Sequence, residues 1–145
     1  TQMYSIIKSA HNVIGMAVMF ILLVIVIIVL VRLLSKKPFD KLSKTSALIG
    51  LISTHLQILL GFLIYFISPV GVGNMSGEAM KETISRFYII EHPVGMILAA
   101  VLITIGYRRI KNDKYSDAKK HQQILIFYGI GLAIISYFIP WFVWS

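Results

Sequence analysis

Residues 13–34 read VIGMAVMFILLVIVIIVLVRLL, a run with a single charged residue, Arg32, close to its end. At about 1.5 Å per residue, an α-helix of this length crosses the roughly 30 Å of hydrocarbon in a bilayer. An apolar run of this length is typical of a transmembrane helix, whereas a helix on the surface of a soluble protein has a polar face. The run therefore predicts a membrane span.

Three further apolar runs lie between Ala47 and Val70, between Phe87 and Tyr107, and between Ile124 and Trp144. Of the 145 residues, 57% are hydrophobic and only 14% are charged, whereas an average soluble domain has about 25% charged residues. We therefore predict an all-α integral membrane protein, with four transmembrane helices in an up-down-up-down bundle. A single domain is expected over residues 1–145, with helices at about 4–34, 46–69, 79–108 and 120–144.

The basic residues predict the orientation of the chain in the membrane. Eleven of the 14 Lys and Arg residues lie in or beside two short loops: Arg32, Lys36, Lys37, Lys41 and Lys44, and Arg108, Arg109, Lys111, Lys114, Lys119 and Lys120. Positive charge in short loops marks the cytoplasmic face. We therefore expect a multi-pass membrane protein with both termini on the non-cytoplasmic side, which in a bacterial inner membrane is the periplasmic side. The lipid bilayer, and no nucleic acid, is the expected partner of these charges.

The segment from Ser68 to Ser85 is expected on the outer side, with an irregular first part and a helical lead-in to helix three from Gly77. Aromatic residues gather near the outer ends of helices two and four, where interfacial anchoring explains them best: Tyr65, Phe66, Tyr137, Trp141 and Trp144. The chain contains no cysteine, and it shows no phosphate loop, paired catalytic carboxylates or nucleophile–base pair. No catalytic residue is assigned, and enzyme activity is left open.

The chain has four histidines, and each falls on a different predicted helix or at its edge: His11, His55, His92 and His121. Ionisable residues inside a membrane are rare and mark functional sites. The helical rise places His55 within about 5 Å of the bilayer centre and His92 roughly 8 Å from it, in the outer half. His11 is expected at the outer edge of helix one. His121 follows two lysines at the cytoplasmic edge and resembles a solvated loop residue.

His11 and His92 form the best-matched pair, because helices one and three are diagonal in the predicted bundle and both residues lie in the outer half. Gly15 and Gly95 share the helix faces of these histidines and leave room for a flat macrocycle. Neutral imidazole binds haem iron well, and two such ligands leave no open position, which suits electron transfer. The pattern therefore favours a haem gripped between two histidines.

Alternatives to this pair remain open. His55 is an alternative partner for His92, or it pairs with His121 around a second, inner haem, although their expected depths differ by more than about 10 Å. A three-histidine zinc or iron site would need its ligands at one depth, which the sequence does not predict. In the ordinary interpretations, His11 is an interfacial residue and His55 is a hydrogen-bonding residue between packed helices.

Other polar residues lie near the expected outer end. Lys8 and Arg86 are placed where the propionates of an outer haem would point, or they extend to lipid headgroups. Glu91 either passes protons to a quinone, orients a ligand, or forms a structural ion pair with Arg86. Pro93 removes the amide bond to the Ile89 carbonyl and predicts a kink in helix three.

Four stretches resemble a small bacterial four-helix family that is usually labelled cytochrome B-like: SAHN (9–12), STHLQILLGFLIYFISP (53–69), RFYIIEHP (86–93) and FYGIGLAIISYFIPW (127–141). This resemblance covers nearly the whole chain. The HLQILLG stretch is more loosely similar to the cytochrome b561 group and to the half-bundles of haem A synthase. The resemblance implies a haem b protein with His11, His55 and His92 at the matching positions, and it leaves His121 outside the pattern.

We therefore expect a membrane b-type cytochrome that transfers electrons, with one haem b or, alternatively, two. Its partners are expected to be a quinone or a periplasmic redox protein. It is also expected to be a subunit of a larger respiratory or redox complex, with other membrane subunits or copies of itself. The alternative function is a haem-free accessory subunit of a membrane protein complex. A proton-coupled transporter that uses Glu91 and His92 would need paired broken helices, which the sequence does not show.

Overall fold

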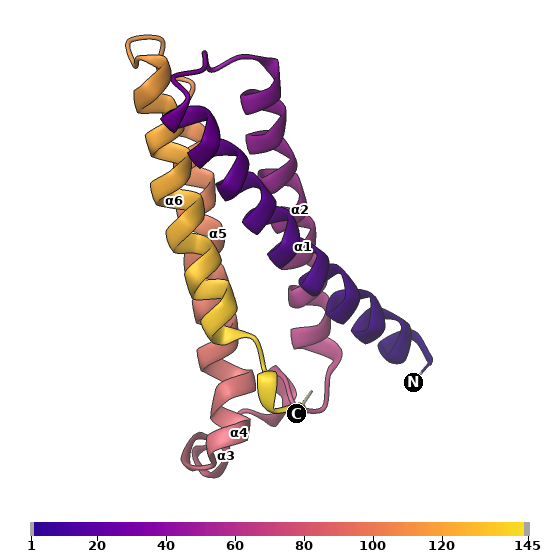
Figure 1. Ribbon diagram of the computed structural model, residues 1–145. Helices are drawn as coiled ribbons and strands as arrows, with labels where there is room; N and C mark the ends of the chain where they lie inside the picture. The colour runs from indigo at the N-terminus through magenta and orange to yellow at the C-terminus, as the bar shows by residue number, and fades with distance from the viewer. Residues whose placement is uncertain (1, 144–145) are drawn as a thin grey trace.

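The computed structural model describes residues 2–143, and within that range it contains helices and turns but no strand. Four long helices dominate it (Figure 1): α1 (Gln2–Leu34), α2 (Lys41–Ile67), α5 (His92–Arg109) and α6 (Asp117–Phe138). The shorter elements are η1 (Val72–Asn74), α3 (Gly77–Lys81), α4 (Thr83–Arg86), the π-helix η2 (Phe87–Glu91) and η3 (Trp141–Val143). The prediction of an all-helical chain is confirmed.

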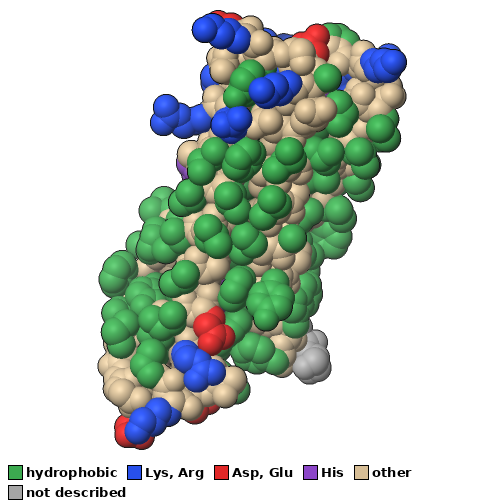
Figure 2. Space-filling view, turned by 90° about the vertical axis from the view of Figure 1, so that its left-hand side faces the viewer, with side chains coloured by type: hydrophobic (Ala, Val, Ile, Leu, Met, Phe, Trp, Pro, Cys, Tyr) green, Lys and Arg blue, Asp and Glu red, His purple; other side chains and the backbone are tan. Residues whose placement is uncertain are grey.

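Four helical segments are long and apolar enough to cross a membrane: Gln2–Leu34, Lys41–Asn74, Thr83–Arg109 and Asp117–Phe138. Only 17% to 33% of the most apolar part of each segment is buried inside the protein. Figure 2 shows the consequence on one face, where hydrophobic side chains cover the middle and charged side chains gather at the two ends. An apolar surface of this extent is suited to contact with lipid or with another apolar protein surface.

The four long helices pack in a ring. α1 packs against α2 and α6, and α5 packs against the same two helices. α1 and α5 therefore lie across the bundle from each other. The segments that join α1 to α2 and α5 to α6 lie together at the top of Figure 1, and the segment between α2 and α5 lies at the bottom. Towards its N-terminus α1 leans away from α6.

The core of the bundle is narrow and is centred on Tyr128, whose side chain is fully buried. Its hydroxyl donates a hydrogen bond of 2.6 Å to the backbone carbonyl of Ala47 in α2. Small residues of α2 make room for the ring, because a Cβ atom at Gly50 would lie 2.8 Å from Tyr128 Cε2. α1 covers this centre with a stripe of buried residues spaced three and four apart: Val18, Leu22, Ile25 and Val29. Buried apolar surface thus joins α1, α2 and α6, and the hydrogen bond between α6 and α2 adds about 1 kcal/mol.

The third predicted helix is not continuous. Residue Glu82 has an extended backbone, with φ −94° and ψ 127°, and it separates α3 from α4. Its carboxylate caps α4 by accepting hydrogen bonds from the amides of Ile84 and Ser85. Hydrogen bonds from the hydroxyl and the amide of Ser85 hold the pKa of Glu82 below its usual value. A capping carboxylate therefore interrupts the expected helix of residues 79–108 near its start.

Pro93 leaves the carbonyl of Ile89 without a partner in its own helix. It cannot donate to the carbonyl of Ile89, and the hydroxyl of Tyr65 in α2 donates to that carbonyl instead, at 2.9 Å. The π-helix η2 (Phe87–Glu91) immediately precedes this turn, as expected where the regular helical bonding is broken. Tyr65, predicted as an interfacial anchor, thus ties α2 to the start of α5.

α6 ends at Phe138 and does not continue to residue 144 as predicted. The physical reason is Pro140, which has no amide proton for the carbonyl of Ser136. The indole Nε1 of Trp141 donates to that carbonyl at 2.7 Å. Trp144, the other predicted tryptophan anchor, lies outside the described residues.

Candidate functional site

His11 in α1 and His92 in α5 meet across the bundle. Their ring centroids lie 6.3 Å apart, and the ring planes are at 84°. Two imidazoles that bind one metal ion from opposite sides have centroids about 6 Å apart, because each metal–nitrogen bond is about 2 Å long. The structure thus brings the best-matched pair of the sequence together at a separation that suits two-sided ligation. That the pair binds haem stays a prediction.

The end of α6 fixes the tautomer of His92. Nδ1 of His92 lies 2.7 Å from the backbone carbonyl of Phe138. A carbonyl only accepts, so Nδ1 carries the proton and Nε2 has a free lone pair. Histidines that bind metals commonly donate their second N–H to a carbonyl in this way. The carbonyl of Phe138 is available because α6 stops there.

His11 is held from α2. The amide Nε2 of Gln57 donates to the backbone carbonyl of His11 at 2.7 Å. Gly61 lies against the imidazole, since a Cβ atom there would be in van der Waals contact with His11 Cε1, at 3.4 Å. Nδ1 of His11 and Oε1 of Gln57 are buried without a hydrogen-bond partner among the described residues. Buried polar atoms of this kind require an explanation, and a bound polar or metal-containing group would provide one.

The two glycines expected to leave room for a macrocycle are in contact with other side chains. A Cβ atom at Gly95 would overlap the ring of Phe138, and one at Gly15 would lie 2.8 Å from Nε2 of Gln57. A flat group beside the two histidines therefore requires Phe138 and Gln57 to adopt other rotamers. The separation of the two rings matches ligation of one metal ion, whereas the space that a macrocycle would need is occupied by these two side chains.

Arg86 forms an ion pair with Glu91, 2.9 Å between Nε and Oε2, and also donates from a terminal nitrogen to the carbonyl of Met80. This bears out the ion-pair interpretation of Glu91. Lys8 lies exposed on α1, one helical turn before His11. The roles of Arg86 and Lys8 towards propionates stay predictions.

His55 lies apart from this pair, on the exposed seam between α2 and α5. Its Nε2 is 2.9 Å from the hydroxyl of Thr104, and that hydroxyl donates to the carbonyl of Ala100 at 2.7 Å. The proton of this contact therefore comes from His55 Nε2. This hydrogen bond between helices matches the ordinary interpretation of His55. Thr104 gave no signal in the sequence beyond being a hydroxyl residue in an apolar run.

The expectation that His121 is a solvated loop residue is wrong. Its side chain is fully buried, its Nε2 lies 2.7 Å from the hydroxyl of Ser43, and its ring packs on Phe39 at 4.8 Å. The reason is that α6 already begins at Asp117, so His121 is in its second turn and faces α2. Nε of Arg32 donates to the same Ser43 hydroxyl at 2.9 Å. His121 belongs to a structural network at the basic end.

Among the described residues, no three His, Asp, Glu or Cys side chains lie close enough to hold a metal ion together. A two-histidine pair is a different arrangement, in which the remaining ligands of the iron belong to the macrocycle.

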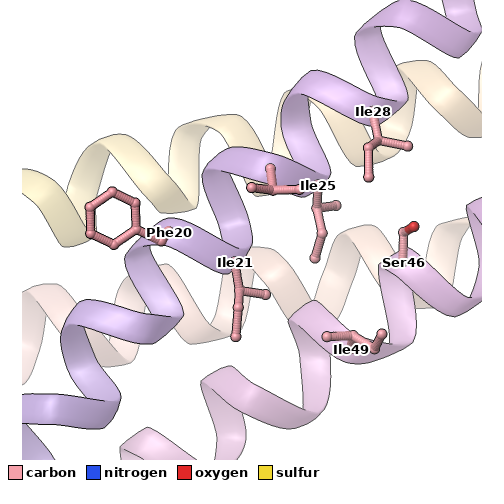
Figure 3. A pocket seen from close by; sticks show the side chains of 7 residues that line it. Phe20, Ile21, Ile25, Ile28, Ser46 and Ile49 are labelled. Carbon is pink, nitrogen blue, oxygen red and sulfur yellow. The ribbon is translucent and has the colours of Figure 1, made fainter.

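A groove of about 330 Å³ lies between α1 and α2 (Figure 3). All but one of its lining side chains are hydrocarbon: Phe20, Ile21, Val24, Ile25, Ile28 and Ile49, together with Ser46. The hydroxyl of Ser46 donates to the carbonyl of Leu42 at 2.8 Å, within its own helix. The groove therefore offers shape for an acyl chain and no group for chemistry.

Comparison with protein-family models, curated proteins and solved structures finds no match for this chain. The fold and the histidine pair define the class: a four-helix protein with helices long and apolar enough to span a membrane. The resemblance to cytochrome B-like proteins stays a prediction.

Proposed function

We propose that this chain is a four-helix membrane cytochrome of the b type that binds one haem between His11 and His92 and transfers electrons. The observation that carries the proposal is the approach of these two imidazoles, at 6.3 Å between centroids, from diagonal helices. A haem with two imidazole ligands takes up and releases single electrons and has no open position for oxygen chemistry.

The residues around the pair set up ligation in distinct ways. The carbonyl of Phe138 holds the ring of His92 and directs its Nε2 lone pair away from α6. In the present packing Gln57 ties the backbone of His11 to α2, and this hydrogen bond would be given up when Gln57 makes room for a haem. Phe87 packs on the ring of His92 at 5.7 Å between centroids.

We further propose that the chain crosses the bacterial inner membrane four times, up-down-up-down, with both termini in the periplasm. The two basic loops lie at the same end of the bundle, and the segment between α2 and α5 lies at the other end. Eleven of the 14 basic residues are at the first end, which the positive-inside rule assigns to the cytoplasm. The histidine pair then lies in the outer half, within reach of a quinone or a periplasmic redox protein.

Single cysteines test this orientation without interference, because the chain contains no cysteine. In a bacterial host, Gly73→Cys is expected to react with a membrane-impermeant maleimide in intact cells, and Asp113→Cys only after lysis. Gly73 has open space around a new Cβ atom, so the substitution is tolerated. Labelling in the reverse order would contradict the topology.

The proposed function is tested by the haem content of the purified full-length chain, produced in cells supplied with a haem precursor. About one haem per chain is expected, as a single two-histidine site requires. A chain that stays colourless, and takes up no added haem in detergent, would overturn the proposal.

One observation favours a second function, that of a haem-free accessory subunit of a membrane complex. The spaces at Gly95 and Gly15 receive Phe138 and Gln57, so the bundle is packed without a cofactor. The exposed apolar surface would then contact a partner: at most a third of each apolar window is buried. A colourless chain that co-purifies with other membrane subunits is the result this function predicts.

A further inference from the structure

A second groove, here named the aromatic groove, lies beside the histidine pair, between α4 and η2 on one side and the end of α6 with the residues after it on the other. Its volume is about 360 Å³, within the range of roughly 300–1,000 Å³ of small-molecule sites. Five of its nine lining residues are aromatic: Phe87, Tyr137, Phe138, Trp141 and Phe142, with Thr83, Ile84, Glu91 and Ile139 completing it. Such a lining fits a planar ring better than a flexible acyl chain.

The aromatic groove is connected to the histidine pair through one ring. Phe87 contacts His92 at 5.7 Å and Phe142 at 5.3 Å between centroids. Phe138, another lining residue, supplies the carbonyl that holds His92. A ligand in this groove would therefore lie one aromatic side chain away from the proposed iron ligand.

Glu91 provides the polar contact. Its side chain is 41% exposed and lines the groove, and only its Oε2 is engaged by Arg86, at 2.9 Å. A carboxylate accepts several hydrogen bonds, so Oε1 is able to accept one from a ligand hydroxyl. The ion pair with Arg86 holds the carboxylate in place. The π-helix that carries Phe87 and Glu91 places both on the groove, and π-helical turns are frequent at functional sites.

We propose that the aromatic groove binds the head group of an isoprenoid quinol, with its ring among the aromatic side chains and one hydroxyl donating to Glu91. This inference deepens the proposed function and rests on it for the role of the bound quinol. The groove lies where the apolar surface meets the charged outer end, marked by the exposed Lys81 and Glu78. A quinol, with a polar ring and a hydrocarbon tail, matches that boundary.

The test uses Trp141, which lines the groove, as an optical probe in nanodiscs. In the background of W144F it is the only tryptophan of the chain. A short-tailed benzoquinone is expected to quench its fluorescence with saturation, and the matching quinol, added under argon, to compete. E91Q is expected to weaken quinol binding about tenfold, because the charged carboxylate acceptor is replaced by a neutral amide oxygen, which accepts a weaker hydrogen bond. The quinone, which donates no proton, is expected to bind E91Q within about twofold of the parent.

Two controls sharpen the result. E78Q removes an exposed carboxylate at the same end that does not line the groove, and is expected to bind both ligands like the parent. Ile84→Phe fills the groove and is expected to abolish saturable quenching. Quenching that rises linearly with quinone in the bilayer, or quinol binding that is equal in the parent and E91Q, would overturn the proposal.

Fluorescence is read on the haem-free chain as well as on the haem-loaded one, so the two proposals fail separately. Saturable, Glu91-dependent binding to a chain that cannot take up haem supports the groove while the cytochrome proposal falls. If the chain binds haem but its quenching rises only linearly with quinone, the cytochrome proposal stands and the proposal of a quinol site in the aromatic groove is overturned.

Discussion

Changing His92 to alanine is expected to lower bound haem from about one per chain to less than about a tenth of that. Loss of an outer-shell partner alone costs about 10–100-fold in metal affinity, and loss of the ligand itself costs more. His11→Ala is expected to have the same effect, because the two imidazoles, with ring centroids 6.3 Å apart, are proposed to bind the same iron. The measurement is haem per chain, on protein shown to be folded by circular dichroism.

The matched control for these variants is His55→Ala. His55 is also a histidine inside an apolar run, but it is hydrogen-bonded to Thr104 on the exposed seam of α2 and α5. Its replacement is expected to leave haem content unchanged. Full haem content in His92→Ala would contradict the assignment of the pair. Loss of haem in His55→Ala, with full haem content in His11→Ala, would also contradict it and would favour ligation by His55.

His121→Ala is expected to destabilise the chain by about 2–4 kcal/mol and to leave the haem content of the folded protein unchanged. The substitution removes a fully buried ring that packs on Phe39, and it takes a hydrogen-bond partner from Ser43. Cavity formation and a lost buried hydrogen bond together give that magnitude. Reversible unfolding in a denaturing detergent, followed by circular dichroism, measures it.

His121→Gln distinguishes the two contributions, because an amide retains a hydrogen bond to Ser43 while losing the ring. It is expected to be more stable than His121→Ala. His55→Ala, which loses a single exposed hydrogen bond, is expected to cost no more than about 1 kcal/mol. A His121→Ala variant as stable as the parent would show that the network at the basic end is not structural.

The four long helices could be predicted from the sequence because apolar runs of about 20 residues are typical of membrane-spanning helices and rare in other structures. The break at Glu82 could not, because it depends on a carboxylate that caps α4 in competition with a continuing helix. The end of α6 carried a readable signal in Pro140, which the apolar run to residue 144 masked. The burial of His121 escaped prediction because two lysines precede it, while the helix turns its side chain inwards, away from them.

For the candidate site, the proximity of His11 and His92 could be predicted because both lie in the half of the bundle away from the basic loops, on helices that are diagonal. What holds them could not be predicted. The carbonyl of Phe138 becomes available only because α6 stops there, and the amide of Gln57 reaches α1 only in the packed bundle. Backbone carbonyls carry no mark in a sequence, so a proton-fixing partner of this kind is visible only in three dimensions.

The measurement that tests the central claim most directly is the reduced-minus-oxidised visible spectrum of the purified full-length chain. A sharp α-band of a six-coordinate, low-spin b haem is the predicted result, because two imidazoles fill both axial positions. A colourless protein after production with added haem, or a five-coordinate, high-spin spectrum, would contradict ligation by His11 and His92.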